Sequence, residues 1–116
     1  MDNFEIPIFK KAYELYQAFH GYRDAVKKRD RHTIWERSEN AVLDLIEGIL
    51  AASEAYKAEK LPILKNVSVK LNLLRVFIRL AKDAKVIDLK KYMVLEEMID
   101  EIGRMLGGWM RSVKEL

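Results

Sequence analysis

The chain has 116 residues, which is enough for one domain that buries a substantial core without covalent cross-links. It contains no cysteine, so disulfides, zinc fingers and thiol catalysis are excluded and a reducing cytoplasmic setting is favoured. The longest uncharged run is residues 15–22, and Asp2 and Glu5 stand where a signal peptide would be basic, so we expect neither a membrane span nor a leader.

The first predicted helix follows Pro7, which suits the first helical position because its missing N–H would have no partner there. Apolar residues then recur every three or four positions, as on one face of a helix, until a basic cluster is reached. The pattern predicts a helix over residues 8–29. Its core positions are Ile8, Ala12, Leu15, Phe19, Tyr22 and Val26.

The second predicted helix begins at Thr33. Thr33 and Glu36 have the spacing of a capping box, in which each side chain bonds the backbone N–H of the other residue. The apolar pattern that follows predicts a helix over residues 33–57, with a second apolar stripe at Leu43, Ile46 and Leu50. Its core positions are Trp35, Ser38, Val42, Leu45, Ile49, Ala52 and Tyr56.

Two more helices are predicted in the second half of the chain. Pro62 marks the first turn of a helix over residues 61–84, and Asp88 can cap a helix over residues 88–114. The core positions of the last helix are Tyr92, Leu95, Ile99, Ile102, Leu106, Trp109 and Val113. Since the connections are short, the sequence predicts a single all-α domain over residues 1–116, an up-down-up-down four-helix bundle.

The third predicted helix combines positive charge with an unusually large apolar surface. Seven of the 26 residues 60–85 are Lys or Arg, and only Asp83 is acidic. One lengthwise polar stripe consists of Lys65, Ser68, Asn72, Arg75, Arg79 and Lys82. Much of the remaining surface is apolar, through Val69, Leu73, Val76, Phe77 and Leu80. Two interpretations remain open: a central helix with solvated or paired cations, or an oligomer that presents an aligned cationic ridge to a polyanion.

Three glycines, Gly103, Gly107 and Gly108, fall inside the fourth predicted helix, where together they cost about 2–3 kcal/mol relative to alanine. Either the helix ends at Gly107 or Gly108, or the missing side chains let another helix approach closely or make room for Trp109. Because Leu106 and Trp109 continue the core stripe without a break in phase, close packing is the favoured interpretation.

Three segments of the chain resemble one known family. They are LRVFIRLAKD at residues 74–83, EEMIDEIGRMLGGWMRS at residues 96–112, and TIWERSENAVLDLIEGILAA at residues 33–52. The string Arg-Met-Leu-Gly-Gly-Trp is the most specific part. Together they are similar to the accessory variability determinant (Avd) proteins of diversity-generating retroelements.

The resemblance implies a four-helix bundle that assembles into a pentameric barrel with a basic surface. It further implies that this homo-oligomer binds a reverse transcriptase and its RNA, and supports the error-prone cDNA synthesis that diversifies a target gene. A related set of bundles, encoded within intervening sequences of ribosomal RNA genes, shares the fold and assembly.

Arg75 and Arg79 occupy the two arginines of the first motif, and Lys82 follows one turn later. The resemblance makes them the leading candidates for contact with RNA, DNA or the polymerase. Arginine suits phosphate because its planar fork makes paired hydrogen bonds. The competing interpretation is that these side chains pair with carboxylates, among which Asp44, Glu47 and Glu101 are available. The full candidate set is Lys27, Lys28, Arg29, Arg31, Lys65, Arg75, Arg79, Lys82, Arg104 and Arg111.

The sequence offers little support for catalysis. Neither His20 nor His32 has the glutamate three residues before it that a di-iron bundle requires. His32 can share a helix face with Glu36 and Glu39, but capping and surface pairing explain that cluster. We therefore expect a non-enzyme without metal or cofactor.

Two classes of function remain. The first is a reverse-transcriptase and nucleic-acid accessory module. The second is a self-assembling structural bundle of the ribosomal intervening-sequence type, whose charges serve solubility and assembly.

Overall fold

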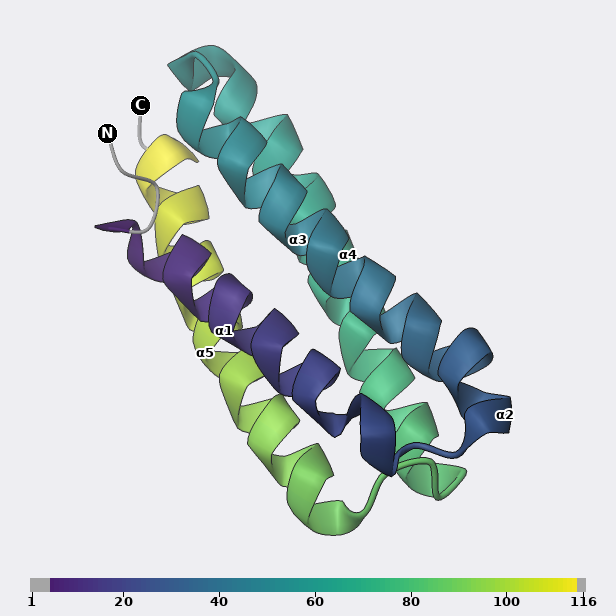
Figure 1. Ribbon diagram of the computed structural model, residues 1–116. Helices are drawn as coiled ribbons and strands as arrows, with labels where there is room; N and C mark the ends of the chain where they lie inside the picture. The colour runs from purple at the N-terminus through teal and green to yellow at the C-terminus, as the bar shows by residue number, and fades with distance from the viewer. Residues whose placement is uncertain (1–4, 115–116) are drawn as a thin grey trace.

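Figure 1 shows a computed structural model of the chain, in which residues 5–114 are described; Asp2 lies outside them. The helices are α1 (Pro7–Tyr22), α2 (Lys28–Asp30), α3 (Glu36–Glu54), α4 (Lys57–Asp83) and α5 (Leu89–Lys114). The four long helices run alternately up and down and form the predicted four-helix bundle. Helix α4 packs against α3 and α5, and α1 packs against the same two helices.

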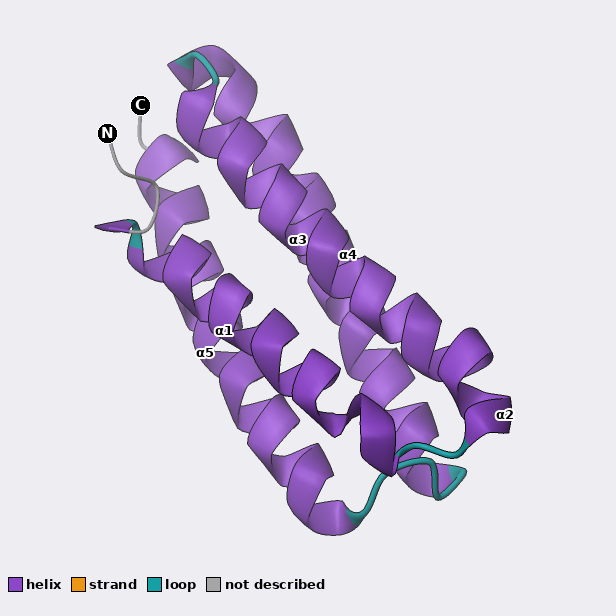
Figure 2. Ribbon diagram, in the orientation of Figure 1, coloured by secondary structure: helices purple, strands orange, loops and turns teal. Residues whose placement is uncertain are grey.

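Short connections leave the described part of the chain almost wholly helical, and Figure 2 shows no strand in it. None of these helices is long and apolar enough to cross a membrane.

The predicted core stripes largely meet along the bundle axis. Trp35 is fully buried, its Nε1 donates a hydrogen bond to the carbonyl of Phe19 over 3.2 Å, and the two rings lie 4.9 Å apart. Tyr56 is the clear exception, since it is 83% exposed. It lies beyond the end of α3, so the chain has already turned away from the core, and its assignment to the core was wrong.

The first helix ends at Tyr22, so the predicted end at residue 29 was wrong. After a 3₁₀ turn at Arg23–Ala25, the backbone extends at Val26 (φ −87°, ψ 134°). This bend directs the Val26 side chain into the core, where it is 1% exposed. The sequence pattern placed Val26 in the core correctly, but burial is achieved by leaving the helix.

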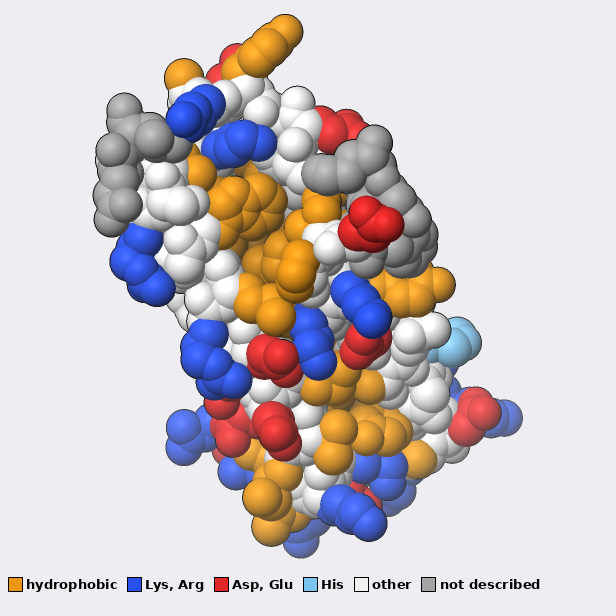
Figure 3. All heavy atoms as spheres, turned by 90° about the vertical axis from the view of Figure 1, so that its left-hand side faces the viewer, with side chains coloured by type: hydrophobic (Ala, Val, Ile, Leu, Met, Phe, Trp, Pro, Cys, Tyr) orange, Lys and Arg blue, Asp and Glu red, His pale blue; other side chains and the backbone are white. Residues whose placement is uncertain are grey.

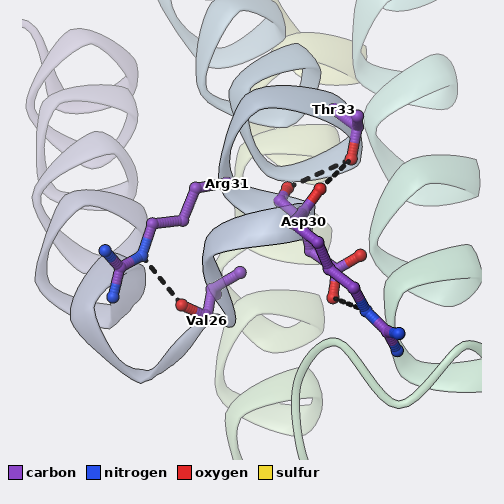
Figure 4. Close-up of polar contacts among 5 residues, drawn as sticks. Val26, Asp30, Arg31 and Thr33 are labelled. Atoms are coloured by element: carbon purple, nitrogen blue, oxygen red, sulfur yellow. Dashed lines mark hydrogen bonds and ion pairs between the residues drawn. The ribbon is translucent and has the colours of Figure 1, made fainter.

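Thr33 does not cap a helix as predicted. The chain is already helical from Lys28, and Thr33 marks a kink between α2 and α3, with φ −119° and ψ −106°. Its hydroxyl donates to the carbonyls of Arg29 and Asp30 at 3.4 and 3.3 Å (Figure 4). A threonine hydroxyl inside a helical stretch bonds backward to carbonyls, because the N–H groups ahead of it are already used.

Helix α4 begins at Lys57, one turn before the predicted start, so Pro62 lies inside the helix. The turn is made by Ala55 and Tyr56, whose ψ values near 150° are extended. Lys60 then reaches back, and its Nζ donates to the carbonyl of Ala52 at 2.6 Å. The same carbonyl accepts a weaker bond from the Ala55 N–H at 3.4 Å, so the cation strengthens the last turn of α3 and complements the helix dipole.

Helix α5 continues through all three glycines to Lys114, so the alternative of a helix end at Gly107 or Gly108 was wrong. Its start agrees with the prediction, because the Asp88 carboxylate accepts a hydrogen bond from the Lys91 N–H at 2.8 Å. That bond is the main reason why the pKa of Asp88 lies below its usual value.

Close helix packing is present at Gly48 on α3, where a Cβ would lie 2.5 Å from Cγ2 of Val67 on α4. By contrast, a Cβ at Gly107 or Gly108 would meet only Arg111 within 4 Å. Gly108 lines an apolar cleft of about 350 Å³ with Trp109 and Met105, at the end of the bundle where the termini lie. Figure 3 shows hydrophobic side chains gathered in a hollow on this face.

Candidate nucleic-acid interface

The predicted polar stripe lies along α4, and its cations differ in solvent exposure and in whether they form ion pairs. Lys65 and Arg79 are exposed, whereas Arg75 and Lys82 are half-buried. Arg79 makes no ion pair with a carboxylate in the described part of the chain. Arg79 is therefore the arginine of the motif whose guanidinium is available to a partner.

Arg75 is occupied within the subunit. Its Nη1 donates a hydrogen bond to Oδ1 of Asp100 on α5, and the same two groups form an ion pair. The guanidinium reaches Asp100 by passing over Gly103, where a Cβ would lie 2.7 Å from Nη2 of Arg75. This glycine of α5 is thus explained by a side chain rather than by a neighbouring backbone. Asp100 lies one turn before Arg104 on α5, yet it pairs with Arg75 of α4.

A cleft of about 390 Å³ surrounds this pair, between α4 and α5. Arg75 and Asp100 meet across it, and the exposed Arg104 lies on its rim. Arg111, one of the remaining candidates, is exposed further along α5 and folds back beside Gly107. The cleft walls therefore carry two arginines and one carboxylate, and only Arg104 lacks an ion pair there.

Lys82 contacts an aromatic ring and a carboxylate. Its Nζ lies 4.6 Å from the centre of the Tyr92 ring and 3.6 Å from Oδ1 of Asp83. The Tyr92 hydroxyl donates to Oε2 of Glu96 at 2.6 Å, and this bond is the main reason why the pKa of Tyr92 is raised. Lys82 is held over an aromatic face with its ammonium still partly accessible to solvent.

An apolar strip borders the free cations on α4. It consists of Val69, Leu73, Val76 and Leu80, which recur at helical spacing and are 64%, 37%, 60% and 52% exposed. We call this set the apolar seam. Other exposed apolar side chains include Leu89, Met93 and Val94 on α5 and Leu43 on α3. Phe77, also predicted to lie on the surface of α4, is half-buried, with the Arg37 guanidinium 5.6 Å from its ring.

The basic candidates between α1 and α3 differ in their surroundings. Arg31 is structural, since its Nε donates to the carbonyl of Val26 at 2.8 Å (Figure 4). Its Nη2 also donates to the carbonyl of Asp24 at 3.2 Å. These bonds satisfy carbonyls that lost their helical partners when α1 ended. Lys27 and Lys28 are exposed, and Arg29 is exposed beside the Asp30 carboxylate at 3.7 Å.

The cluster of His32, Glu36 and Glu39 does not form a site. His32 and Glu36 are exposed, whereas Glu39 is buried with its Oε2 3.4 Å from Nη1 of Arg23. Its other oxygen has no hydrogen-bond partner in the described part of the chain. Among residues 5–114, no three His, Asp or Glu side chains come together as metal ligands would.

Sequence reasoning did not select the lysines of the turn between α4 and α5. Lys85 and Lys91 line a cleft of about 560 Å³ there, together with Lys82 and with Ala25 from the other basic connection. A signal was present, because Lys82 and Lys85 stand just before the short apolar pair Val86 and Ile87, and Lys90 and Lys91 follow soon after the Asp88 cap. Their proximity to residue 25 depends on the topology.

Comparison with known proteins agrees with the fold and with the motifs on α3, α4 and α5. The family model described as bAvd-like matches residues 7–113, which includes all four long helices apart from the last residue of α5. No curated protein matches the chain. Since the match covers nearly the whole chain, the protein belongs to the bAvd-like family.

Proposed function

We propose that this protein is a non-catalytic accessory factor of a diversity-generating retroelement, and that it binds the reverse transcriptase and its RNA. The proposal is supported by membership of the bAvd-like family. The structural observation that carries it is the surface of α4, where the unpaired Arg79 stands beside the exposed apolar seam.

Assembly is the first part of the proposal. Each apolar seam residue retains a large exposed area, and burial of apolar surface contributes about 25 cal/mol per Å². An exposed seam at helical spacing is what a second helix would cover, as in a coiled coil. The exposed Met93 and Val94 on α5 follow Lys90 and precede the acidic pair Glu96 and Glu97. These two carboxylates beside exposed apolar side chains would complement a partner surface that carries cations. We propose that five copies close into a ring.

Contact with RNA or polymerase is the second part. In a ring, Arg79 would recur once per subunit, so several guanidinium groups would face one polyanion. Such contacts release counterions and give binding that is strong at low salt and falls steeply as salt rises. Phosphate contacts position a nucleic acid without reading its bases, so little base specificity is expected.

The test uses Arg75→Gln and Arg79→Gln, singly and together, with Lys10→Gln on the exposed face of α1 as the control for loss of one charge. Each variant is measured for oligomer mass, melting temperature, binding of structured RNA and co-elution with a reverse transcriptase of a diversity-generating retroelement. We expect Arg79→Gln to weaken binding with assembly intact. Unchanged RNA and polymerase binding in the double variant would show that Arg75 and Arg79 on α4 do not make these contacts.

A second candidate is a self-assembling structural bundle of the ribosomal intervening-sequence type without a polymerase partner. It is favoured by the number of α4 cations that pair inside the subunit. Arg75 pairs with Asp100, Lys70 lies 3.4 Å from Asp44, and Lys82 lies near Asp83. A reverse-transcriptase gene with a template and variable repeat beside this gene would decide for the first function.

A further inference from the structure

Two basic connections that are far apart in sequence meet at one end of the bundle. The first is residues 23–31, between α1 and α3, and the second is residues 82–91, around the turn from α4 to α5; both lie at the lower end in Figure 1. Ala25 of the first connection lines the same cleft as the second, and the Lys91 ammonium lies 5.7 Å from the ring centre of Tyr22. We call these two segments together the basic pole.

The basic pole carries more positive charge than the whole protein. Its two segments contain nine Lys and Arg residues against four Asp, a surplus of five, whereas the full chain has a net charge of +3. The rest of the chain is therefore net negative. A polyanion that approaches the molecule is attracted to this end, because the summed field of clustered charges guides association.

The cleft in the basic pole combines cations with an apolar floor. Lys82, Lys85 and Lys91 line it, and Val86 and Ile87 are almost fully buried beneath it. Asp88 is the one carboxylate in the lining, and its two oxygens already accept from the N–H and the ammonium of Lys91, at 2.8 and 3.1 Å. Lys85 is exposed and has no carboxylate partner in the described part of the chain.

The backbone at Lys85 is unusual in a way that points to function. Lys85 has φ of 61° and is the one residue of the described chain with a left-handed backbone. Lys85 ends α4 in a Schellman motif. The Val86 N–H donates to the Ala81 carbonyl at 2.8 Å, and the Lys85 N–H donates to the Lys82 carbonyl at 3.0 Å. Glycine or asparagine fits this position with less steric cost than lysine. A lysine at this position lowers the stability of the fold, but it places an ammonium at the mouth of the cleft.

We propose that the basic pole is a further nucleic-acid surface of this protein, in addition to Arg79 on α4, with a backbone phosphate held in the cleft by Lys82, Lys85 and Lys91. The inference rests on the proposed RNA binding and specifies where it occurs. The end of the bundle presents Lys85 without a carboxylate partner among the described residues, and Lys82 and Lys91 pair only with Asp83 and Asp88 of the same turn. On the flank of α4, Arg75 and Lys70 pair across to neighbouring helices, and Arg79 is the free arginine of the motif. Lys27 and Lys28 extend the surface beyond the cleft.

The decisive variant is Lys85→Asn, because asparagine keeps the left-handed backbone but lacks the charge. Lys57→Gln removes one charge from an exposed site at the opposite end of the bundle and is the matched control, and Lys85→Arg retains the charge. Each full-length variant is titrated with a structured RNA hairpin across a salt series, after its oligomer mass and melting temperature are recorded.

We expect Lys85→Asn to melt at the same temperature as the parent or higher and to keep its oligomer mass. Its RNA affinity should fall about fivefold to tenfold near 0.1 M salt, and its salt slope should be lower by about one for each phosphate that the variant no longer neutralises. Lys85→Arg and Lys57→Gln should bind like the parent. Equal affinity and slope in Lys85→Asn and Lys57→Gln would overturn the inference while leaving RNA binding itself in place.

Two further outcomes separate the possible failures. If the parent does not bind RNA even at low salt, the proposed function fails together with the inference. Calorimetry with inorganic phosphate at matched ionic strength tests the source of the phosphate group. Binding of inorganic phosphate that depends on Lys85, combined with RNA binding that does not, would assign the cleft to a free phosphate and overturn its role in holding a nucleic-acid backbone.

Discussion

The guanidinium of Arg75 occupies the space that a side chain at Gly103 would require, since a Cβ there would lie 2.7 Å from Nη2. The glycine on α5 thereby lets an arginine of α4 cross to Asp100 and join the two helices through an ion pair. Both residues stand in motifs of the family resemblance, and the structure gives them a joint role within one subunit. That role separates Arg75 from Arg79, which has no such partner among the described residues.

Gly103→Ala should therefore displace Arg75 without unfolding the bundle. The guanidinium is the end of a flexible side chain and can move, while alanine gains up to about 1 kcal/mol of helix propensity over glycine. A half-exposed ion pair contributes about 0–1 kcal/mol, so we expect the free energy of unfolding to change by less than about 1 kcal/mol. Denaturant unfolding measures the change. A double-mutant cycle of Arg75→Gln and Asp100→Asn should show coupling in the parent and almost none in Gly103→Ala.

Gly48→Ala should be harmful, in contrast to Gly103→Ala. A Cβ at position 48 would lie 2.5 Å from Cγ2 of Val67, a branched and buried side chain that cannot rotate away. Overpacking of this kind costs about 1–3 kcal/mol. Gly21→Ala is the matched control, because nothing lies within 4 Å of that position, and it should be neutral or slightly stabilising. Equal melting temperatures for the two variants would contradict the close approach of α3 and α4.

Val76→Glu should dissociate the oligomer and preserve the subunit. Val76 lies within the apolar seam and is 60% exposed in the single chain, so a charge there is solvated in the monomer but buried without a partner in an assembly. Light scattering coupled to gel filtration gives the mass, and circular dichroism gives the helix content. A parent protein that elutes as a 13.6 kDa monomer at micromolar concentration would exclude the ring.

Gly107→Leu distinguishes packing within the subunit from packing between subunits. Only Arg111 lies near this position in the single chain, so overpacking inside the subunit is not expected. Leucine should leave the helix content unchanged, and a lower oligomer mass would show that a second copy approaches α5 at this glycine. If the monomeric subunit itself melts at a much lower temperature, the described packing of α5 is wrong.

The cap of α5 should weaken in acid. The pKa of Asp88 is lowered in the folded protein, chiefly by the hydrogen bond from the Lys91 N–H, so its stabilising effect is present above the ordinary value of 3.8 and is lost as the pH falls toward the lowered pKa. Asp88→Ala lacks the cap at every pH. The melting temperatures of parent and variant should therefore differ at neutral pH and converge in this acidic range. A constant gap would mean that the carboxylate charge does not contribute.

The long helices could be predicted from the sequence because their apolar residues keep one phase over many turns. The stripe predicted from Leu95 to Leu106 is buried, and on α4 the in-phase apolar residues from Leu64 to Ala81 are buried against it in the core. The errors occur where the chain turns. Val26 is apolar and in phase with α1, so periodicity extended the helix, whereas the backbone unwinds to bury the same side chain. Thr33 has capping-box spacing to Glu36, yet the helix has already begun before it.

The polar stripe on α4 was also predictable, but the state of each cation was not. Pairing of Arg75 depends on Asp100 and Gly103, which lie on the following helix and come next to Arg75 only after folding. The basic pole depends in the same way on topology, because neither residues 23–31 nor residues 82–91 show from their own composition that they meet. The left-handed backbone of Lys85 was not indicated, since glycine is the usual residue at such a position.

The most direct test of the account is the affinity of the parent protein for a structured RNA across a salt series. If the basic surface binds the phosphate backbone, the logarithm of the association constant should fall linearly with the logarithm of salt, and affinity should drop by at least about tenfold between about 50 and 200 mM. RNAs of unrelated sequence but similar shape should give the same slope. Absence of binding at the lowest salt, or an affinity that does not change with salt, would contradict the central claim that this bundle is a polyanion-binding accessory protein.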